Sequence, residues 1–428
     1  MIPIEYTVIV SGNRVLISVE VLGFLPTSAI QVIQRRPAVA LSSLTKGVAV
    51  NILQFRDIIG ADRGFRVAAD VVTQTIDGVN LNTIWNEFQQ ALDVWNRDHQ
   101  LIAELFTFGT VADHDTLPLD GGTFDFEDAS EFGVPKAGRA EPKGYIVGFP
   151  LDWKDAATRY TMAFLRDADK QQVDNDFAAA VNADRRLLFR STLSALTSPS
   201  VLGSRETNEK GFSIYSLYAG SSDDIPPTFA GRTFNPGHNH YLVSGAASVD
   251  GGDLRDLTEH IQHHGHGLPI NGERVIIMVN PQEGAIIRGL RRDPDSPMTA
   301  PYDFIPSVTA PAYLTDQTIV GDKAPAEFEG LPIIGSYGDA WVFESYYIPA
   351  GYVLAVGTAG KNSLRNPLAF REHPTAEQRG LRLLPGRNSY PLVESYYQRG
   401  FGVGVRNRGA AAVMQIKASG SFDTPTWP

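Results

Sequence analysis

Residues 113–160 limit the fold of this chain more than any other segment. Their ends are strand-like, with LPL and TFDF at the start and YIVGFPLDW at the finish, whereas the middle, EDASEFGVPKAGRAEPK, is rich in glycine, proline and charge. Such a middle has too little apolar surface to form a core of its own. A two-stranded ribbon alone is marginally stable in water. The sequence therefore predicts a long β-ribbon with a polar tip that must lie against another element.

The composition excludes several classes of protein. The 428 residues contain no cysteine, which rules out disulfide scaffolds, thiolate zinc sites, iron–sulfur clusters and cysteine nucleophiles. The formal charge of −11 argues against a general nucleic-acid binder, which would carry a basic surface. No segment has the pattern of a secretory signal, and no uncharged apolar run approaches the roughly 18–20 residues of a membrane-spanning helix. We therefore expect a protein that is made in the cytoplasm and enters no membrane.

Two segments are predicted to be helices. Residues 83–106 repeat apolar side chains at near-helical spacing, and Asn82 or Thr83 can cap their start. We expect this apolar stripe to pack against a neighbour, in the same subunit or in another. Residues 168–196 form the longest predicted helix, because they are rich in alanine and contain no glycine or proline. At 1.5 Å per residue this helix would be roughly 40 Å long.

Strand-like runs stand on both sides of these helices. YTVIV and RVLISVEVL flank Ser11-Gly12-Asn13, which predicts a hairpin near the N-terminus. After the long helix, the strand-like ERVIIMVNP lies between two helical stretches, DLRDLTEHIQHH and QEGAIIRGLR. Such alternation suggests an α/β subdomain. The C-terminal block is again rich in strands.

The sequence GFGVGV at residues 400–405 alternates glycine with larger apolar side chains. It approaches the pattern of a dinucleotide-binding loop, but Val405 stands where the last glycine should be, and no helix follows. Alternation with a period of two places Gly400, Gly402 and Gly404 on one face of a strand. We expect another element to cross that face closely.

A group of histidines is the candidate for metal chemistry. His260 and His264 stand one helical turn apart, and with Asp256 they could offer three ligands to zinc on one helix face. No glutamate follows His260 in an HExxH pattern, and glycines end the helix at once. The primary prediction is therefore no metal, no cofactor and no catalytic residue, and a helix end that faces solvent or an interface. The group comprises His260, His263, His264 and His266.

The order of these elements resembles the major capsid protein of tailed bacteriophages with the HK97-type fold. A helix precedes a ribbon with a charged tip, and then come a long helix, an α/β stretch and closing strands. Two segments, DGVNLNTIWNEFQQALDVWN and YPLVESYYQRGFGVGVRNRGAAAVMQI, look most like actinobacteriophage capsid proteins. The resemblance implies an α+β, HK97-like capsid fold and a structural protein that is not an enzyme. Such a protein self-assembles into the icosahedral head that encloses phage double-stranded DNA.

The resemblance also implies a division of the chain and a set of partners. The expected partners are copies of the chain in hexamers and pentamers, scaffolding, portal and decoration proteins, and DNA enclosed without sequence-specific binding. The expected location is the virion, after assembly in the host cytoplasm. The domains are 1–112 as an N-terminal arm, 113–160 as the extended β-ribbon or E-loop, 161–240 as the peripheral domain with its spine helix, 241–355 as the axial domain, and 356–428 as a return to the peripheral domain.

Two groups of residues are implied to act between subunits. The ribbon tip would contact the next subunit through charged side chains. Some members of the family also join subunits by an isopeptide bond between an E-loop lysine and an asparagine, with a glutamate as base. The tip residues are Glu127, Asp128, Glu131, Lys136, Arg139, Glu141 and Lys143, and the crosslink candidates are Lys136 or Lys143 with Asn388 and Glu394, or with Asn362.

Two alternatives to a phage head remain open. An encapsulin-type nanocompartment shell would keep the fold and change the cargo. A soluble α/β metalloenzyme using Asp256, His260 and His264 would belong to another class.

Many relatives carry a charged helical scaffolding segment that is cleaved off, whereas residues 1–80 are β-like and apolar. We therefore expect no maturation cleavage and an extension that grips the shell surface.

Overall fold

The computed structural model describes most of the chain after residue 71 and a short hairpin before it. It divides into two units, Met1–Arg56 and Asp57–Pro428. In the first unit, strands β1 and β2 pair antiparallel, which confirms the predicted N-terminal hairpin. Of the predicted N-terminal extension over residues 1–80, residues 72–80 are also described, and the remainder lies outside the described residues. The described residues are 4–10, 13–19, 72–98, 101–118, 128, 133, 144–221, 225–308, 324–389 and 392–427, and the two strands are β1 (Ile4–Val10) and β2 (Asn13–Val19).

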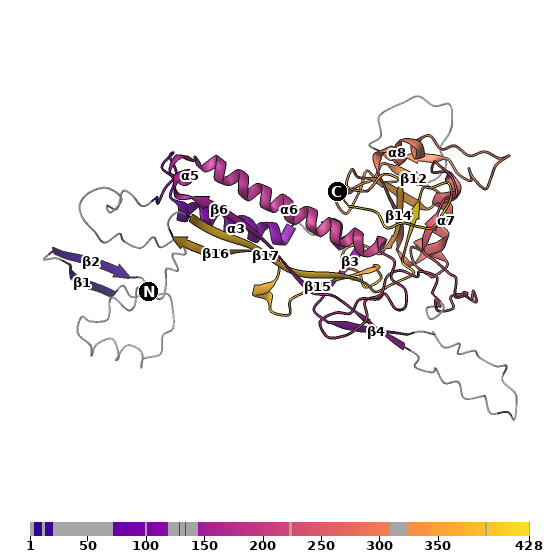
Figure 1. Cartoon of the computed structure of the whole chain (residues 1–428), viewed down its shortest axis with the longest axis horizontal. Helices are drawn as coiled ribbons and strands as arrows, with labels where there is room; N and C mark the ends of the chain where they lie inside the picture. The colour runs from indigo at the N-terminus through magenta and orange to yellow at the C-terminus, as the bar shows by residue number, and fades with distance from the viewer. Residues whose placement is uncertain are drawn as a thin grey trace. The chain divides into compact units, whose positions relative to one another are not determined.

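The predicted spine helix is present in the second unit as α6 (Lys170–Thr197). Its start is fixed by a capping box, in which the Asp169 carboxylate accepts from the Gln172 backbone N–H and the Gln172 side chain accepts from the Asp169 N–H. The helix runs along a sheet that contains the long strand β17 (Figure 1). In the part of the chain that the structure describes, no helix is long and apolar enough to cross a membrane.

The sheet beside α6 has five strands, in the order β16–β17–β15–β3, with β6 paired to β17 as well. The long strand β17 is its centre, since it pairs with β16 and β6 over its first part and with β15 over its last part. A short helix, α5, follows β6. The elements are β3 (Thr107–Thr110), β6 (Asp152–Thr161), α5 (Met162–Asp167), β15 (Leu368–Glu372), β16 (Leu381–Ser389) and β17 (Leu392–Val405).

The structure corrects the extent of the predicted ribbon over 113–160. Strands β4 (His114–Pro118) and β5 (Gly144–Gly148) pair with each other. Strand β6, however, pairs with β17 along ten residues and belongs to the five-stranded sheet. Pro150 stands between β5 and β6, and because proline has no N–H to donate, it interrupts the ladder there.

The glycine face of β17 is crossed closely, as the alternation predicts. A Cβ atom on Gly402 would collide with the Pro150 carbonyl oxygen, and one on Gly400 would lie 2.7 Å from the Trp153 ring. On the opposite face, Phe401 and Val405 are buried in the core. Glycine is therefore required here by the approach of another backbone segment rather than by a turn.

Substituting Gly402→Ala should lower the free energy of unfolding by about 1–3 kcal/mol, because the added methyl group must push the Pro150 carbonyl away. Urea denaturation of the purified subunit measures this change. The matched control is Gly109→Ala in β3 of the same sheet, where the added Cβ would meet nothing nearer than the Asn362 Oδ1 at 3.5 Å. Equal midpoints for both variants would contradict the steric argument.

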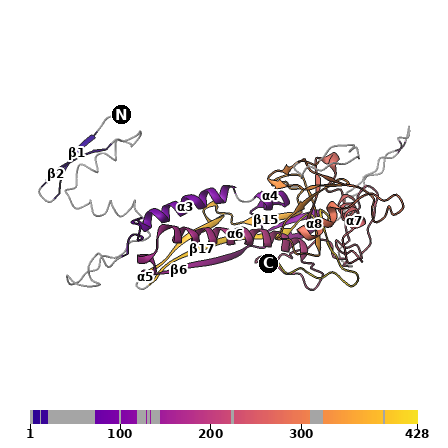
Figure 2. The same cartoon turned by 90° about the horizontal axis from the view of Figure 1, so that it is seen from above.

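The predicted helix over 83–106 is present as two helices, α3 (Leu81–Asp98) and α4 (Leu101–Phe106). The two pack into different cores. In α3, Leu92 and Trp95 pack against β16 and α6, together with Leu383. In α4, Leu105 and Phe106 join the core of a second sheet. The apolar stripe of α3 is thus covered within the same subunit, and Figure 2 shows α3 and α6 beside the same sheet.

A buried ion pair ties α3, α6 and β17 together. The Asp184 carboxylate on α6 accepts from Arg399 Nη1 of β17 at 2.6 Å and from Trp95 Nε1 of α3 at 2.9 Å. Both charged side chains are 2% exposed. Because each charge would be costly alone in this interior, the pair fixes how the three elements pack.

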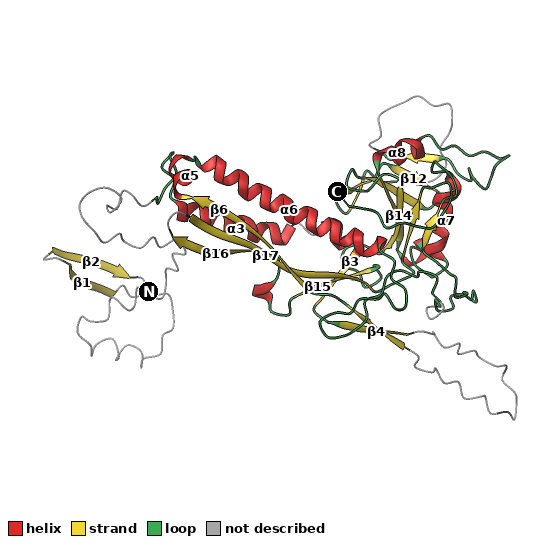
Figure 3. Cartoon of the chain, in the orientation of Figure 1, coloured by secondary structure: helices red, strands yellow, loops and turns green. Residues whose placement is uncertain are grey.

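The second sheet has seven strands, in the order β7–β18–β14–β8–β13–β12–β9. Helices α7 and α8 pack on it (Figure 3), as the predicted α/β subdomain requires. Strands β10 and β11 form a separate two-stranded sheet. The elements are β7 (Tyr241–Val243), α7 (Gly251–Gln262), β8 (Arg274–Val279), α8 (Pro281–Arg288), β9 (Phe304–Pro306), β10 (Glu327–Phe328), β11 (Leu331–Pro332), β12 (Gly335–Tyr337), β13 (Ala340–Glu344), β14 (Tyr352–Thr358) and β18 (Ala411–Gln415).

Both faces of the seven-stranded sheet are buried. Along β8, Val275 and Ile277 belong to one core with α7, whereas Ile276 and Met278 belong to the other. This second core also contains Leu193 of α6 and side chains of α4. The continuous apolar run of β8 is therefore that of a central strand covered on both sides.

The strands of residues 356–428 are divided between the two sheets. Strands β15, β16 and β17 do lie in the five-stranded sheet, but β18 pairs with β14 and β7 in the seven-stranded one. Its first three side chains, Ala411, Ala412 and Val413, are at most 1% exposed. Such a run, apolar on both faces, is covered only in the interior of a sheet with two buried faces.

Candidate assembly surfaces and a histidine cluster

The base of the ribbon formed by β4 and β5 is anchored to the body of the chain. Val147 and Phe149 pack with Phe108 and Ala369 in a small apolar cluster. On β4, the Asp115 carboxylate accepts from Arg406 Nε at 2.6 Å. These contacts hold the two ends of the ribbon, β4 and β5, at fixed positions.

Most residues of the predicted ribbon tip lie outside the described residues. Asp128 is described and exposed. The contact of the tip with a neighbouring subunit stays a prediction. The tip residues outside the described part are Glu127, Glu131, Lys136, Arg139, Glu141 and Lys143.

Among the crosslink candidates, the described side chains already have partners. Glu394 accepts from Arg159 Nε at 3.0 Å and from the Tyr396 hydroxyl at 2.9 Å. The Asn362 side chain accepts from the Gly109 backbone N–H at 2.6 Å, so it holds a loop onto β3. Asn388 lies in β16 opposite Val393. The isopeptide bond stays a prediction.

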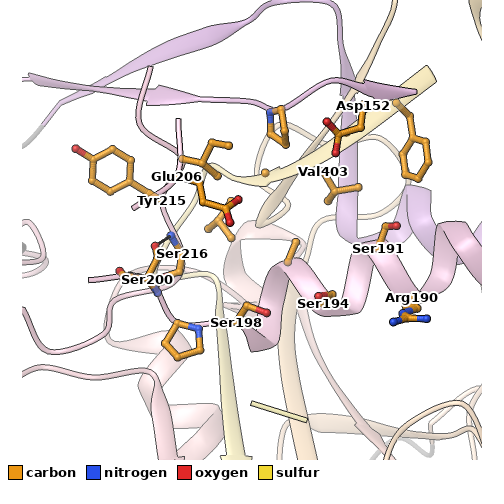
Figure 4. Close-up of a pocket in the computed structure, with 18 of the residues that line it drawn as sticks. Asp152, Arg190, Ser191, Ser194, Ser198, Ser200, Glu206, Tyr215, Ser216 and Val403 are labelled. Atoms are coloured by element: carbon orange, nitrogen blue, oxygen red, sulfur yellow. Dashed lines mark hydrogen bonds between the residues drawn. The ribbon is translucent and has the colours of Figure 1, made fainter. Parts of the chain in front are cut away.

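A cavity of about 590 Å³ lies between the C-terminal half of α6 and β17. Figure 4 shows Ser191 and Ser194 of α6 at this cavity, with Val403 of β17. Two further serines, Ser200 and Ser216, are hydrogen-bonded to each other, since Ser216 Oγ accepts from the Ser200 backbone N–H at 2.9 Å. Ser216 Oγ also donates to a backbone carbonyl. The lining residues that the structure describes include no histidine to act as a base for these hydroxyls. The cavity therefore offers no histidine-activated serine.

Four histidine side chains converge at one point in the second sheet's domain. His238 and His240 come from the segment just before β7, and His263 and His264 from the end of α7. The Nε2 atoms of His238, His240 and His264 are 2.9–3.1 Å apart, and His263 Nε2 lies 3.3 Å from His238 Nε2. All the ligand atoms of the four lie within 4.8 Å of one another.

Burial keeps this histidine cluster neutral. The pKa of His238 is lowered to about 4 and that of His263 to about 3, in both cases first by loss of solvation. Burial also lowers the pKa of His240 and of His264 well below the ordinary value. At neutral pH the four imidazoles therefore face one another without charge.

The cluster differs from the ligand set that the sequence offered as an alternative. The Asp256 carboxylate is held by Arg255 at 2.8 Å, and His260 Nδ1 donates to the Asp256 backbone carbonyl at 2.9 Å. Of the alternative set Asp256, His260 and His264, His264 alone belongs to the converging group. The missed signal is the pair His238 and His240, because residues two apart in an extended segment point to the same side.

The long helix on one sheet, the second sheet with two buried faces and the anchored ribbon base define an HK97-like capsid fold, as predicted. A scan against protein-family models finds no match, and neither does a search of curated proteins. Solved structures do match. A chain from Mycobacterium phage Patience is 36% identical, the match covers 86% of this chain and 97% of that one, and the TM-score is 0.65.

Other solved structures match more weakly. The capsid of Cyanophage P-SCSP1u is 12% identical over 74% of this chain and 88% of that one, with a TM-score of 0.42. The holo-SrpI encapsulin complex from Synechococcus elongatus is 12% identical over 77% of this chain and 91% of that one, with a TM-score of 0.40.

The chain belongs to the major capsid proteins of tailed bacteriophages. It is a structural shell protein that self-assembles and is located in the virion. The phage assignment rests on the chain from phage Patience, which is 36% identical over 86% of this chain.

Proposed function

We propose that this chain forms the hexamers and pentamers of an icosahedral head that encloses double-stranded phage DNA. The subunits assemble in the host cytoplasm, with scaffolding, portal and decoration proteins as partners, and the chain itself catalyses no reaction. The observation that supports this most is the 36% identity to a phage chain across 86% of the sequence.

The two sheets supply different parts of the shell in this proposal. The five-stranded sheet with α6 is the peripheral domain, and the seven-stranded sheet with α7 and α8 is the axial domain near the capsomer centre. The ribbon reaches a neighbouring subunit. A ribbon needs such support because two strands alone bury too little apolar surface. Repetition of one contact over a closed shell makes a modest free energy per contact sufficient.

The charge of the subunit fits its cargo. A formal charge of −11 repels the phosphate backbone rather than binding it. The inner wall thus surrounds DNA without holding a particular sequence. Weak adhesion lets the DNA slide while the head fills.

Electron microscopy of the purified full-length chain tests the proposal directly. We expect closed particles or ring-shaped capsomers of six and five subunits, because the assembly contacts are built into the chain. Coexpression with the neighbouring head genes of its phage is the matched second sample, since scaffolding is among the proposed partners. Small soluble oligomers in both samples would contradict a shell function.

A further inference from the structure

We propose that His238, His240, His263 and His264 bind one divalent transition-metal ion, zinc by preference, as a structural site of the axial domain. The four side chains come from two segments of the chain, and their nitrogens converge on one point. The site goes beyond the proposed function, which names no metal.

The spacing of the nitrogens fits a tetrahedral ion. Zinc–nitrogen bonds of 2.0–2.1 Å place neighbouring ligand atoms about 3.3–3.4 Å apart in a tetrahedron. The Nε2 atoms of His238, His240 and His264 form an almost equilateral triangle with sides of 2.9–3.1 Å. His263 Nε2, 3.3 Å from His238 Nε2, supplies the fourth vertex. An ion therefore needs only small side-chain shifts, with His263 closing toward the other two nitrogens.

Without an ion, the four Nε2 atoms do not carry enough hydrogens for each close pair of nitrogens to form a hydrogen bond. A carbonyl oxygen only accepts, so His240 Nδ1, 2.6 Å from the Ala411 oxygen, carries the hydrogen, and His240 Nε2 has a bare lone pair. His238 Nε2 faces three other Nε2 atoms within 3.3 Å. A hydrogen on His238 Nε2 can be donated to one of these three atoms at a time. A cation would instead accept all four lone pairs together.

The hydrogen bond from His240 to Ala411 is also the support expected around a metal ligand. A ligating histidine usually donates its other ring nitrogen to a carbonyl or carboxylate, which fixes the tautomer and the ring orientation. His240 is fully buried. The Phe234 ring stacks on His264 with the ring centres 4.3 Å apart. The imidazoles are thus held in place from outside the cluster.

The donor set selects the class of ion. Neutral imidazoles suit zinc, copper and nickel, whereas magnesium and calcium prefer oxygen ligands. Four protein ligands leave no open position, which is typical of a structural rather than a catalytic zinc site.

The ion would join the segment before β7 to the end of α7. The described residues 225–240 contain isolated bridges and turns but no helix or extended strand. A metal bridge from His238 and His240 to the end of α7 closes this segment onto the helix. Through the bond from His240 to Ala411, it also reaches β18. The bridge would therefore stabilise the domain in a chain without disulfides.

Elemental analysis of assembled particles, or of the full chain, tests the site. We expect about one zinc per subunit in protein purified without chelator. His264→Ala should lower the zinc content at least tenfold and lower the melting temperature. The matched control, His260→Ala, removes a neighbouring histidine of the same helix outside the converging group and should keep the zinc. A metal chelator added to the unmodified protein should lower its melting temperature, and added zinc should restore it.

Three results would overturn the proposal. The first is a background zinc content that zinc addition does not raise. The second is equal zinc content in the unmodified protein and in His264→Ala, which would identify adventitious metal only. The third is read without any variant, so it stands even where His264→Ala does not fold. Cobalt(II) added to chelator-treated protein should give the intense visible bands of four-coordinate cobalt, and a six-coordinate spectrum would exclude the site.

Discussion

Arg399→Met should lower the free energy of unfolding by about 3–5 kcal/mol. The variant removes the partner of Asp184, whose carboxylate lies 2.6 Å from the Arg399 guanidinium and is 2% exposed. An unpaired carboxylate would then remain in the interior between α3, α6 and β17. Urea denaturation followed by tryptophan fluorescence measures the loss, since Trp95 donates to the same carboxylate.

The double variant Arg399→Met with Asp184→Leu separates the cost of a lone charge from the loss of packing. Removing both charges should recover most of the lost stability, because apolar replacements of buried pairs are often neutral. The surface control is Lys417→Met, which breaks an exposed pair with Asp423 and should change stability by less than about 1 kcal/mol. A double variant as unstable as Arg399→Met would refute the argument from the buried charge.

Deleting residues 127–142 should abolish closed particles while leaving a folded subunit. The deletion removes the charged tip of the ribbon but keeps β4 and β5, whose anchoring contacts lie in the body of the chain. Without the tip, each subunit loses the contact that we propose it makes with its neighbour. Electron microscopy and sedimentation measure the outcome, and the melting temperature of the subunit checks its fold.

A loop of equal length made of glycine and serine is the control for this deletion. It restores the reach of the ribbon without its charges. If charged contacts carry the interaction, this variant also fails to close shells. Normal particles from the deletion itself would remove the ribbon tip from the assembly contacts.

Elements whose pattern is local could be predicted from the sequence. The helix α6 follows from an uninterrupted run of good helix formers, and its observed bounds differ from the predicted ones by one or two residues. The hairpin of β1 and β2 follows from two β-branched runs around a turn. The close crossing of the glycine face of β17 follows from alternation alone. Each of these signals is contained within a few turns or one strand.

Elements defined by distant partners could not be predicted. The sequence of β6 is strand-like, but nothing local says that its hydrogen bonds go to β17 instead of β5. The same holds for β18, whose partners are β14 and β7. One helix was predicted where α3 and α4 pack into different cores. Pairing over a long sequence separation depends on the whole fold.

The histidine cluster shows the same division. Helical spacing predicts that His260 and His264 share one helix face. The geometry instead adds His238 and His240 from an irregular segment that precedes β7. No periodicity connects that segment to α7. The two are brought together only by the way both pack against the seven-stranded sheet.

The interleaving of early and late strands has a consequence for synthesis of the protein. In the five-stranded sheet, β3 at Thr107–Thr110 lies beside β15 at Leu368–Glu372, and β6 lies beside β17. In the other sheet, β7 pairs with β18 near the C-terminus. A ribosome that stops early releases a chain in which neither sheet is complete. The two sheets can therefore not both gain their full sets of strands until the chain up to Gln415 has left the ribosome.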